Sequence, residues 1–320
     1  MAVPKSAVSL RNLPIGLFGA VMGLAGLGLT ARATATVIPG FIRAPAYFTE
    51  LWVALGVLFF VPLVVLYLAK LVRYPAAVKS EFLSPVQLGF CGTLPVGMSL
   101  VAGGIAPYLP GLGSVVWWVS FVMLLAFQLW ALYRWLSGGI ELAQVNAGWL
   151  VVMVGGIVLP GPGIALGLIE ASHVCFGISA AAATMLMALL FVRAVIGPPL
   201  AEALRPTWFV LLVPPSLIYA NGLTLYNGVV FLENLFYFSL ILAAALLLYA
   251  RRFWRWPVGA PWWAFTFPLD ALAYAAARFA QDHPAPLWKG VAAATLALAT
   301  LFVVIVLFMT FRGWLKGRRA

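Results

Sequence analysis

Long apolar stretches alternate with short polar and basic segments along the whole chain. Ten of these stretches are about as long as the roughly 20 residues that a helix needs to cross a bilayer. They cover residues 13–31, 48–69, 85–105, 112–133, 148–168, 171–192, 207–226, 229–250, 261–277 and 287–311. The pattern predicts ten membrane-spanning helices in one all-α domain over residues 1–320, with short tails at about 1–12 and 312–320.

Proline divides these stretches into two kinds. From the third stretch onward, the odd-numbered stretches carry proline near their middles and the even-numbered ones do not. The prolines are Pro95, Pro160, Pro162, Pro214, Pro215 and Pro268. A proline breaks a helix and frees a carbonyl group that hydrocarbon cannot satisfy. We therefore expect the odd helices to form an inner set around a conduit and the even helices to face lipid.

The prolines also recur at a spacing typical of a repeat. Pro95 and Pro160 are 65 residues apart, and 54 residues separate Pro160 from Pro214 and Pro214 from Pro268. One helical hairpin repeated five times could close into a ring with a pseudo-five-fold axis. Pro62, in the second stretch, departs from the rule, and the sequence offers no reason for it.

Glycine replaces proline in the first stretch and flanks it in others. Gly19 and Gly23 form a small-xxx-small pair that allows helices to approach closely, and Gly97 lies two residues after Pro95. Small residues beside a break leave free volume and expose backbone N–H dipoles, which suit anions without a fixed cation. Tight packing between helices explains the same glycines equally well.

Composition excludes a sizeable soluble domain, because 64% of the residues are hydrophobic and 8% are charged. The net charge of +11 could indicate a nucleic-acid partner, but its distribution favours membrane orientation and no nucleic acid is expected. Fifteen of the 19 basic residues fall on the side of the termini and of the even-to-odd connections. The opposite side holds Arg32, Arg43, Arg278 and Lys289. The positive-inside rule then predicts that both termini are cytoplasmic.

Few residues could carry chemistry. Asp270 lies within the ninth stretch, and an intramembrane carboxyl is a candidate functional site, although it can also be structural. An ionised Asp270 would oppose anions, so a neutral or paired state fits anion passage better.

Glu170 and His173 have the spacing of di-iron bundles, which need a second copy and two further glutamates. No catalytic motif is present, so we expect no enzyme activity, metal or cofactor, and an intramembrane enzyme using Glu170 and His173 is the least favoured alternative.

Three segments resemble a known family. Asn12-Leu-Pro-Ile-Gly-Leu-Phe-Gly19 resembles the start of bacterial tellurite-resistance TehA proteins, and Glu81-Phe-Leu-Ser-Pro-Val86 resembles their entry into the third span. Pro261-Trp-Trp-Ala-Phe-Thr-Phe-Pro268 resembles the ninth helix of both TehA and the plant slow anion channels. Yeast malate permeases belong to the same superfamily of anion channels and C4-dicarboxylate transporters. The order and spacing of the segments extend the resemblance over the whole chain.

The resemblance implies a homotrimer in the bacterial inner membrane, with a pore in each protomer formed by five inner helices. Its members pass small anions such as chloride, nitrate and dicarboxylates. The family's gating phenylalanine matches Phe267, and Gly19 matches the position against which that ring packs. A phenyl ring blocks a narrow apolar pore by its volume and by dewetting. Pro268 fits the plant-type motif, whereas Asp270 departs from the TehA pattern, so selectivity and gating can differ from those of TehA.

Two functions follow from these features. The first is a passive anion channel closed by Phe267, with selectivity set by pore width and backbone dipoles. The alternative is a proton-coupled secondary exporter of dicarboxylate, sulfite or tellurite-type anions, in which Asp270 carries the proton.

Overall fold

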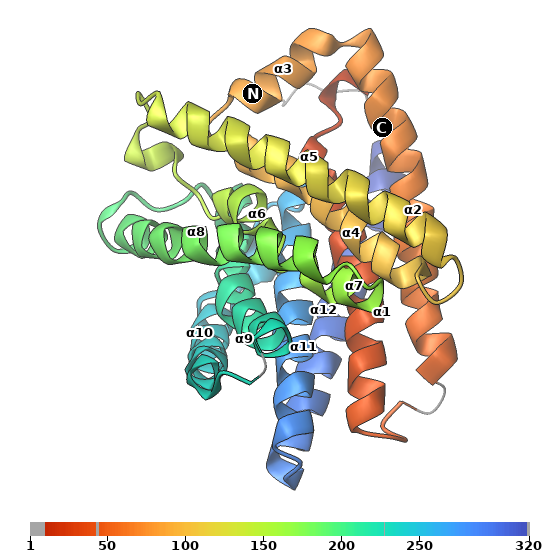
Figure 1. Ribbon diagram of the computed structural model, residues 1–320. Helices are drawn as coiled ribbons and strands as arrows, with labels where there is room; N and C mark the ends of the chain where they lie inside the picture. Colours follow the sequence, from red (N-terminus) through yellow and green to blue (C-terminus); the bar gives the residue numbers. More distant parts are fainter. Residues whose placement is uncertain (1–9, 43–44, 227, 319–320) are drawn as a thin grey trace.

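The computed structural model describes residues 10–42, 45–226 and 228–318, and these fold into helices without any strand, which confirms the all-α prediction (Figure 1). The α-helices are α1 (Gly19–Val37), α2 (Pro45–Arg73), α3 (Pro75–Leu83), α4 (Thr93–Ile105), α5 (Pro110–Leu136), α6 (Trp149–Met153), α7 (Pro160–Ala165), α8 (Ile169–Ile196), α9 (Val213–Leu225), α10 (Glu233–Tyr249), α11 (Thr266–Asp282) and α12 (Pro286–Arg318). The 3-10 helices are η1 (Leu10–Asn12), η2 (Ile15–Phe18), η3 (Leu88–Gly92), η4 (Leu142–Gln144), η5 (Gly155–Ile157), η6 (Glu202–Leu212), η7 (Val230–Leu232), η8 (Phe253–Arg255) and η9 (Ala260–Phe265).

Each predicted apolar stretch is helical, and the chain is a multi-pass membrane protein. Among the described residues, eight helical segments are long and apolar enough to span a bilayer: Ile15–Val37, Pro45–Arg73, Leu88–Ile105, Pro110–Leu136, Ile169–Ile196, Glu202–Leu225, Val230–Tyr249 and Pro286–Gly313. The predicted fifth span is divided into α6, η5 and α7, and the ninth consists of η9 followed by α11. The count of ten spans therefore stays a prediction.

Burial separates the inner helices from the outer ones. In the first, third and seventh predicted spans, 78%, 78% and 83% of the apolar window is buried. In the even-numbered spans the buried share lies between 22% and 39%. In Figure 1, α5 and α8 cross the front of the molecule and α2 runs along its right edge, outside the inner segments. The division that proline predicted between inner and outer helices is thus the division between buried and exposed ones.

The inner segments share a change of helix type rather than a simple kink. A 3-10 helix precedes an α-helix in each: η2 before α1, η3 before α4, η5 before α7, η6 before α9 and η9 before α11. Pro160, Pro214 and Pro268 lie in the first turn of the α-helix that follows. The missing N–H of proline costs little there, since the first N–H groups of a helix have no intrahelical partner.

Polar side chains of the neighbouring helices satisfy the carbonyl groups that these changes release. Most of the donors lie on the outer helices α5 and α8 and point inward. The hydrogen bonds run from Ser120 to the carbonyl of Pro95 (2.6 Å), from Ser179 to Met153 (3.0 Å) and from Asn221 of α9 to Ile157 (2.7 Å). Trp117 donates to the Leu159 carbonyl (3.0 Å), which also accepts from the Gly163 backbone N–H (2.9 Å). Broken helices are tolerated in a membrane when other protein groups bond to their free carbonyls in this way.

The helices pack as consecutive hairpins that close into a ring. α1 packs on α2, α4 on α5, α7 on α8, α9 on α10 and α11 on α12, and contacts of α1 with α11 and α12 join the two ends of the chain. α2 continues through Pro62, which lies on its exposed face, and no contact explains this proline. Residues 1–9 and 319–320 of the predicted tails lie outside the described residues, whereas 312–318 continue α12.

Candidate functional site

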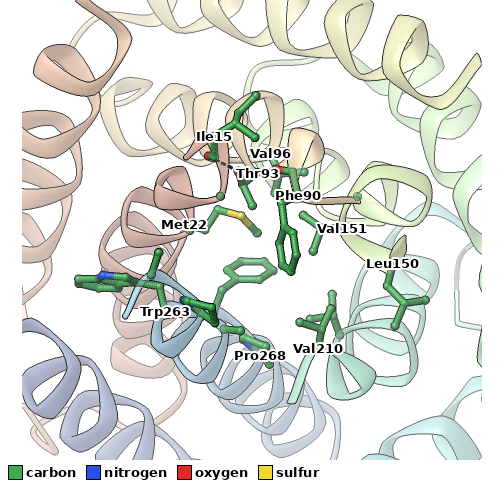
Figure 2. Close-up of a pocket in the computed structure, with 18 of the residues that line it drawn as sticks. Ile15, Met22, Phe90, Thr93, Val96, Leu150, Val151, Val210, Trp263 and Pro268 are labelled. Carbon is green, nitrogen blue, oxygen red and sulfur yellow. Dashed lines mark hydrogen bonds between the residues drawn. The ribbon is translucent and has the colours of Figure 1, made fainter. Parts of the chain in front are cut away.

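A cavity of about 340 Å³, called the large cavity below, lies among the five inner segments. Every inner segment contributes side chains to its lining, and the long outer helices α2, α5, α8, α10 and α12 contribute none. Met22 and Phe90 point into it, and Val210 and Pro268 lie across from Phe90 (Figure 2). The lining is largely apolar, with Glu81, Gln87 and Thr93 as its polar side chains.

A second cavity of about 170 Å³, called the small cavity below, continues among the same five segments. It lies farther along α1 and α11, between Gly26 and Tyr274. Because the inner segments provide most of the lining of both cavities, the two cavities mark out one path between these helices.

Phe267 stands where the two cavities meet. Its side chain and that of Val158 line both the large and the small cavity, and Phe267 is only 6% exposed. Phe265, two residues earlier, lines neither and packs against Phe209 and Phe302 instead. The aromatic ring of Phe267 is therefore the part of α11 that lies between the two cavities.

The Phe267 ring packs on Gly26, and this corrects the expectation that it packs on Gly19. A Cβ atom placed on Gly26 would lie 3.0 Å from the Phe267 ring, whereas one placed on Gly19 would meet only Trp263, at 3.4 Å. Gly23 faces Thr266 so closely that an added Cβ would overlap the threonine side chain. These glycines of α1 let α11 approach closely. Gly26, which lies against the Phe267 ring, is two helical turns farther along α1 than the predicted Gly19.

The other predicted residues divide between the path and the packing around it. Gly19, Pro214 and Pro268 line the large cavity and Pro162 the small one. The residues that line neither cavity are Gly23, Pro95, Gly97, Pro160 and Pro215. Gly97 faces Val21 of α1, so its role is close packing between α1 and α4. Sequence reasoning did not single out Met22, Phe90 or Tyr274 as lining residues, because nothing distinguishes them from other apolar or aromatic residues of the spans.

A buried ion pair neutralises the acid that lines the large cavity. The Lys70 ammonium lies 2.7 Å from the Glu81 carboxylate and donates a second hydrogen bond to the Leu13 carbonyl. The Tyr67 hydroxyl donates to the other Glu81 oxygen, also at 2.7 Å. Lys70 thus joins α2, α3 and the segment before α1 at one mouth of the path, and it offsets a negative charge that would repel anions.

Asp270 is buried beside the gate candidate but lines neither cavity. Its side chain is 1% exposed, and one carboxylate oxygen would lie 3.0 Å from a Cβ atom on Gly26, next to the Phe267 ring. Among the described residues, neither carboxylate oxygen has a hydrogen-bond partner and no cation pairs with it. Asp270 is expected from the sequence to be either neutral or paired, and among the described residues no pair is formed.

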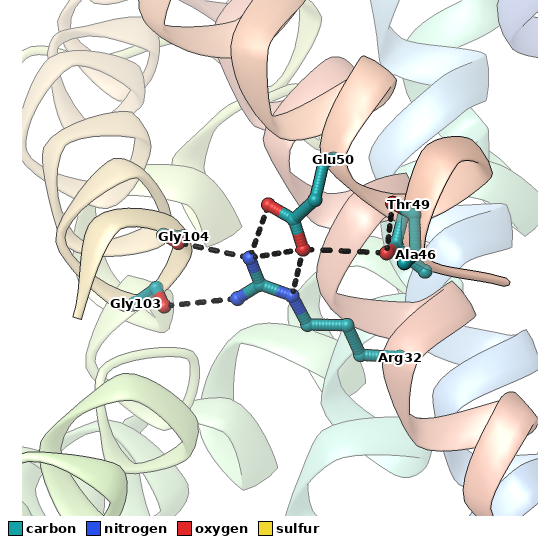
Figure 3. Close-up of polar contacts among 6 residues, drawn as sticks. All are labelled: Arg32, Ala46, Thr49, Glu50, Gly103 and Gly104. Carbon is teal, nitrogen blue, oxygen red and sulfur yellow. Dashed lines mark hydrogen bonds and ion pairs between the residues drawn. The ribbon is translucent and has the colours of Figure 1, made fainter. Parts of the chain in front are cut away.

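A polar cluster fixes the far end of α1. The Arg32 guanidinium makes a bidentate ion pair with Glu50 of α2 and donates to the carbonyls of Gly103 and Gly104 at the end of α4 (Figure 3). These carbonyls belong to the last turn of a helix, where no backbone donor is available. Arg32 therefore ties α1, α2 and α4 together beside Gly103, which lines the small cavity.

The Glu-x-x-His motif forms no cluster within the part of the chain that the structure describes. No group of three or more His, Cys, Asp or Glu side chains is placed to hold a metal ion there. The His173 ring packs edge-on against Tyr226, and Cys91 and Cys175 are buried free thiols.

Comparison with known proteins agrees with this architecture. The profile of the family described as "Voltage-dependent anion channel" matches residues 12–311. The S-type anion channel SLAH3 of Arabidopsis thaliana is 24% identical over 94% of this chain and 48% of its own length, so the chain spans about half of that relative. The Tellurite resistance protein TehA homolog of Haemophilus influenzae is 23% identical over 96% of this chain and 92% of its own. The chain belongs to the voltage-dependent anion channel family.

Proposed function

We propose that the protein is a passive anion channel that conducts small inorganic or organic anions along the path between its inner helices. The observation that carries the proposal is the position of Phe267, whose ring lines both cavities and separates them. The names of relatives such as SLAH3 and TehA agree with a role in anion transport.

The chemistry of the path supports a channel closed by an apolar plug. Val158 and Phe267 are the two residues shared by both cavities, so the constriction between them offers an ion no polar side chain. Water leaves such a constriction readily, and an ion that enters must lose its hydration shell. Removing the ring would join the cavities and admit water and anions together.

Phe267→Ala tests the proposal. We expect at least a tenfold rise in chloride or nitrate current over wild type in planar bilayers or liposomes. Phe308→Ala is a matched control, because Phe308 is exposed on the outer face of α12 and the same truncation there should leave the current unchanged. Unchanged current in Phe267→Ala, with folded protein confirmed in the membrane, would reject Phe267 as the gate.

A proton-coupled exporter is the second candidate, and the unpaired carboxyl of Asp270 favours it. An exporter would show saturating flux driven by a pH gradient, and Asp270→Asn would abolish it. A channel would show ohmic current that survives this substitution.

The proposal also includes assembly as a homotrimer, with one path in each protomer and the exposed apolar outer helices facing lipid or a neighbouring protomer.

A further inference from the structure

The small cavity, next to the gate candidate Phe267, contains a hydrogen-bond donor that has no partner among the described residues. Its side chains with polar atoms are Thr30, Asn221 and Tyr274. The Thr30 hydroxyl donates to the Asp270 carbonyl (3.1 Å), and the Asn221 amide donates to the Ile157 carbonyl (2.7 Å). Two of the three polar groups therefore already have a backbone partner.

The Tyr274 hydroxyl is different. It makes no hydrogen bond to any described residue, and it is not among the fully buried polar atoms that lack a partner, so it keeps accessible surface. The Asn221 amide also has a second N–H, because its amide nitrogen carries two and one hydrogen bond is formed. The small cavity can therefore offer neutral donors to a guest.

Tyr274 lies two turns after Phe267 on α11 and lines the same side of the path. Phe267, Ala271, Tyr274 and Arg278 follow at i, i+4, i+7 and i+11, which puts them on one face of the helix. Phe267, Ala271 and Tyr274 line the small cavity in that order along α11. Arg278 lies one turn farther and is paired with Asp282 at 3.4 Å. An anion that passes the phenyl ring thus reaches the tyrosine hydroxyl before any charged side chain of this face.

An anion at that point needs a donor. It has crossed a constriction without polar side chains, and a hydrogen bond to a charged partner is stronger than one between neutral groups. We propose that Tyr274, with the Asn221 amide, forms a resting site for a small monovalent anion such as chloride or nitrate directly beyond Phe267. The inference rests on the proposed channel function and names the subsite that gives the path its preference among anions.

Crystals grown in bromide test the site itself, whether or not current flows. In wild-type or Phe267→Ala protein we expect an anomalous bromide peak within hydrogen-bond distance of the Tyr274 hydroxyl oxygen. Tyr274→Phe should remove this peak. Absence of the peak from both proteins, or its persistence in the Tyr274→Phe variant, would overturn the inference.

Permeability ratios measure the consequence. A hydroxyl is a point donor that favours compact chloride, so we expect Tyr274→Phe in the Phe267→Ala background to raise nitrate permeability relative to chloride about threefold or more. Tyr219→Phe is the matched control, because its hydroxyl is also unpartnered but lines neither cavity. If Phe267→Ala conducts and Tyr274→Phe leaves the ratio unchanged, the resting site is rejected and the channel stands. If Phe267→Ala does not conduct, Phe267 is rejected as the gate, and the bromide peak alone decides the site.

Discussion

At the scale of single residues, closure of the proposed channel depends on how one aromatic ring packs between α1 and α11. Phe267 rests on Gly26, where the absence of a side chain leaves just enough room for the ring. The neighbouring Asp270 carboxyl touches the same glycine, so two side chains of α11 share one small position on α1. A change at Gly26 should therefore alter gating without removing the gate.

Gly26→Ala should raise the basal current several-fold. The added methyl group would lie 3.0 Å from both the Phe267 ring and the Asp270 carboxylate, so the ring must move away from α1. Overpacking of this kind costs about 1–3 kcal/mol of stability. Gly19→Ala is the control, because its methyl group would meet only Trp263 at an acceptable 3.4 Å. Currents of the two variants in bilayers make the comparison. Equal basal currents would show that the ring is not held closed by its contact with Gly26.

At the scale of elements, the inner segments are held in place by polar groups that reach across helix boundaries. Ser120 and Ser179 on the outer helices bond to carbonyls of the broken inner segments, and Arg32 caps the end of α4. At the opposite mouth, Lys70 and Glu81 form a pair with only 2% and 8% of their side chains exposed. Breaking such a pair leaves a buried charge without a partner.

Lys70→Met should lower the free energy of unfolding by about 3–5 kcal/mol, because Glu81 would keep its buried charge alone. Replacing both residues, as Lys70→Met with Glu81→Leu, should restore part of that loss, since no unpaired charge would remain. Thermal unfolding in detergent measures both variants. Arg278→Met is a control from a more exposed pair and should cost about 1 kcal/mol or less. A double variant less stable than Lys70→Met would contradict this account.

From the third stretch onward, the proline pattern in the sequence predicted which segments are buried, because a broken helix needs protein around it. The buried helix α1, which has no proline, and Pro62 in the exposed helix α2 depart from that rule. The pattern did not predict how the segments break. The α-helix that follows a 3-10 helix begins at Gly19 without proline, and at Pro160 or two residues before Pro268 with it, so the change reflects packing around the path. The packing of Phe267 against Gly26 depends on the register between α1 and α11, which local sequence does not determine. Lys70 and Glu81, 11 residues apart, meet because the chain turns between α2 and α3.

At the scale of the whole molecule, the path is surrounded by five inner segments, and the described residues form no ring of charged side chains along it. Among the described residues, Glu81 is the charged residue that lines the large cavity, and Lys70 neutralises it; none of those that line the small cavity is charged. In the proposed channel, selection among anions would then come from the width of the path, from neutral donors such as Tyr274 and from backbone dipoles. A passive channel of this kind would conduct in either direction, so the orientation of the protein decides which compartment the large cavity opens to.

The distribution of basic residues predicts that the large cavity opens toward the cytoplasm, since Gln87 of its lining lies on the side rich in Lys and Arg. A membrane-impermeant maleimide tests this prediction with two single-cysteine additions at exposed positions, Gln87→Cys and Ala285→Cys. Intact cells should label only Ala285→Cys, and inverted vesicles should label Gln87→Cys. Wild-type protein is the control and should stay unlabelled, because Cys91 and Cys175 are both buried. Labelling of Gln87→Cys from outside intact cells would reverse the orientation and place the large cavity on the outer side.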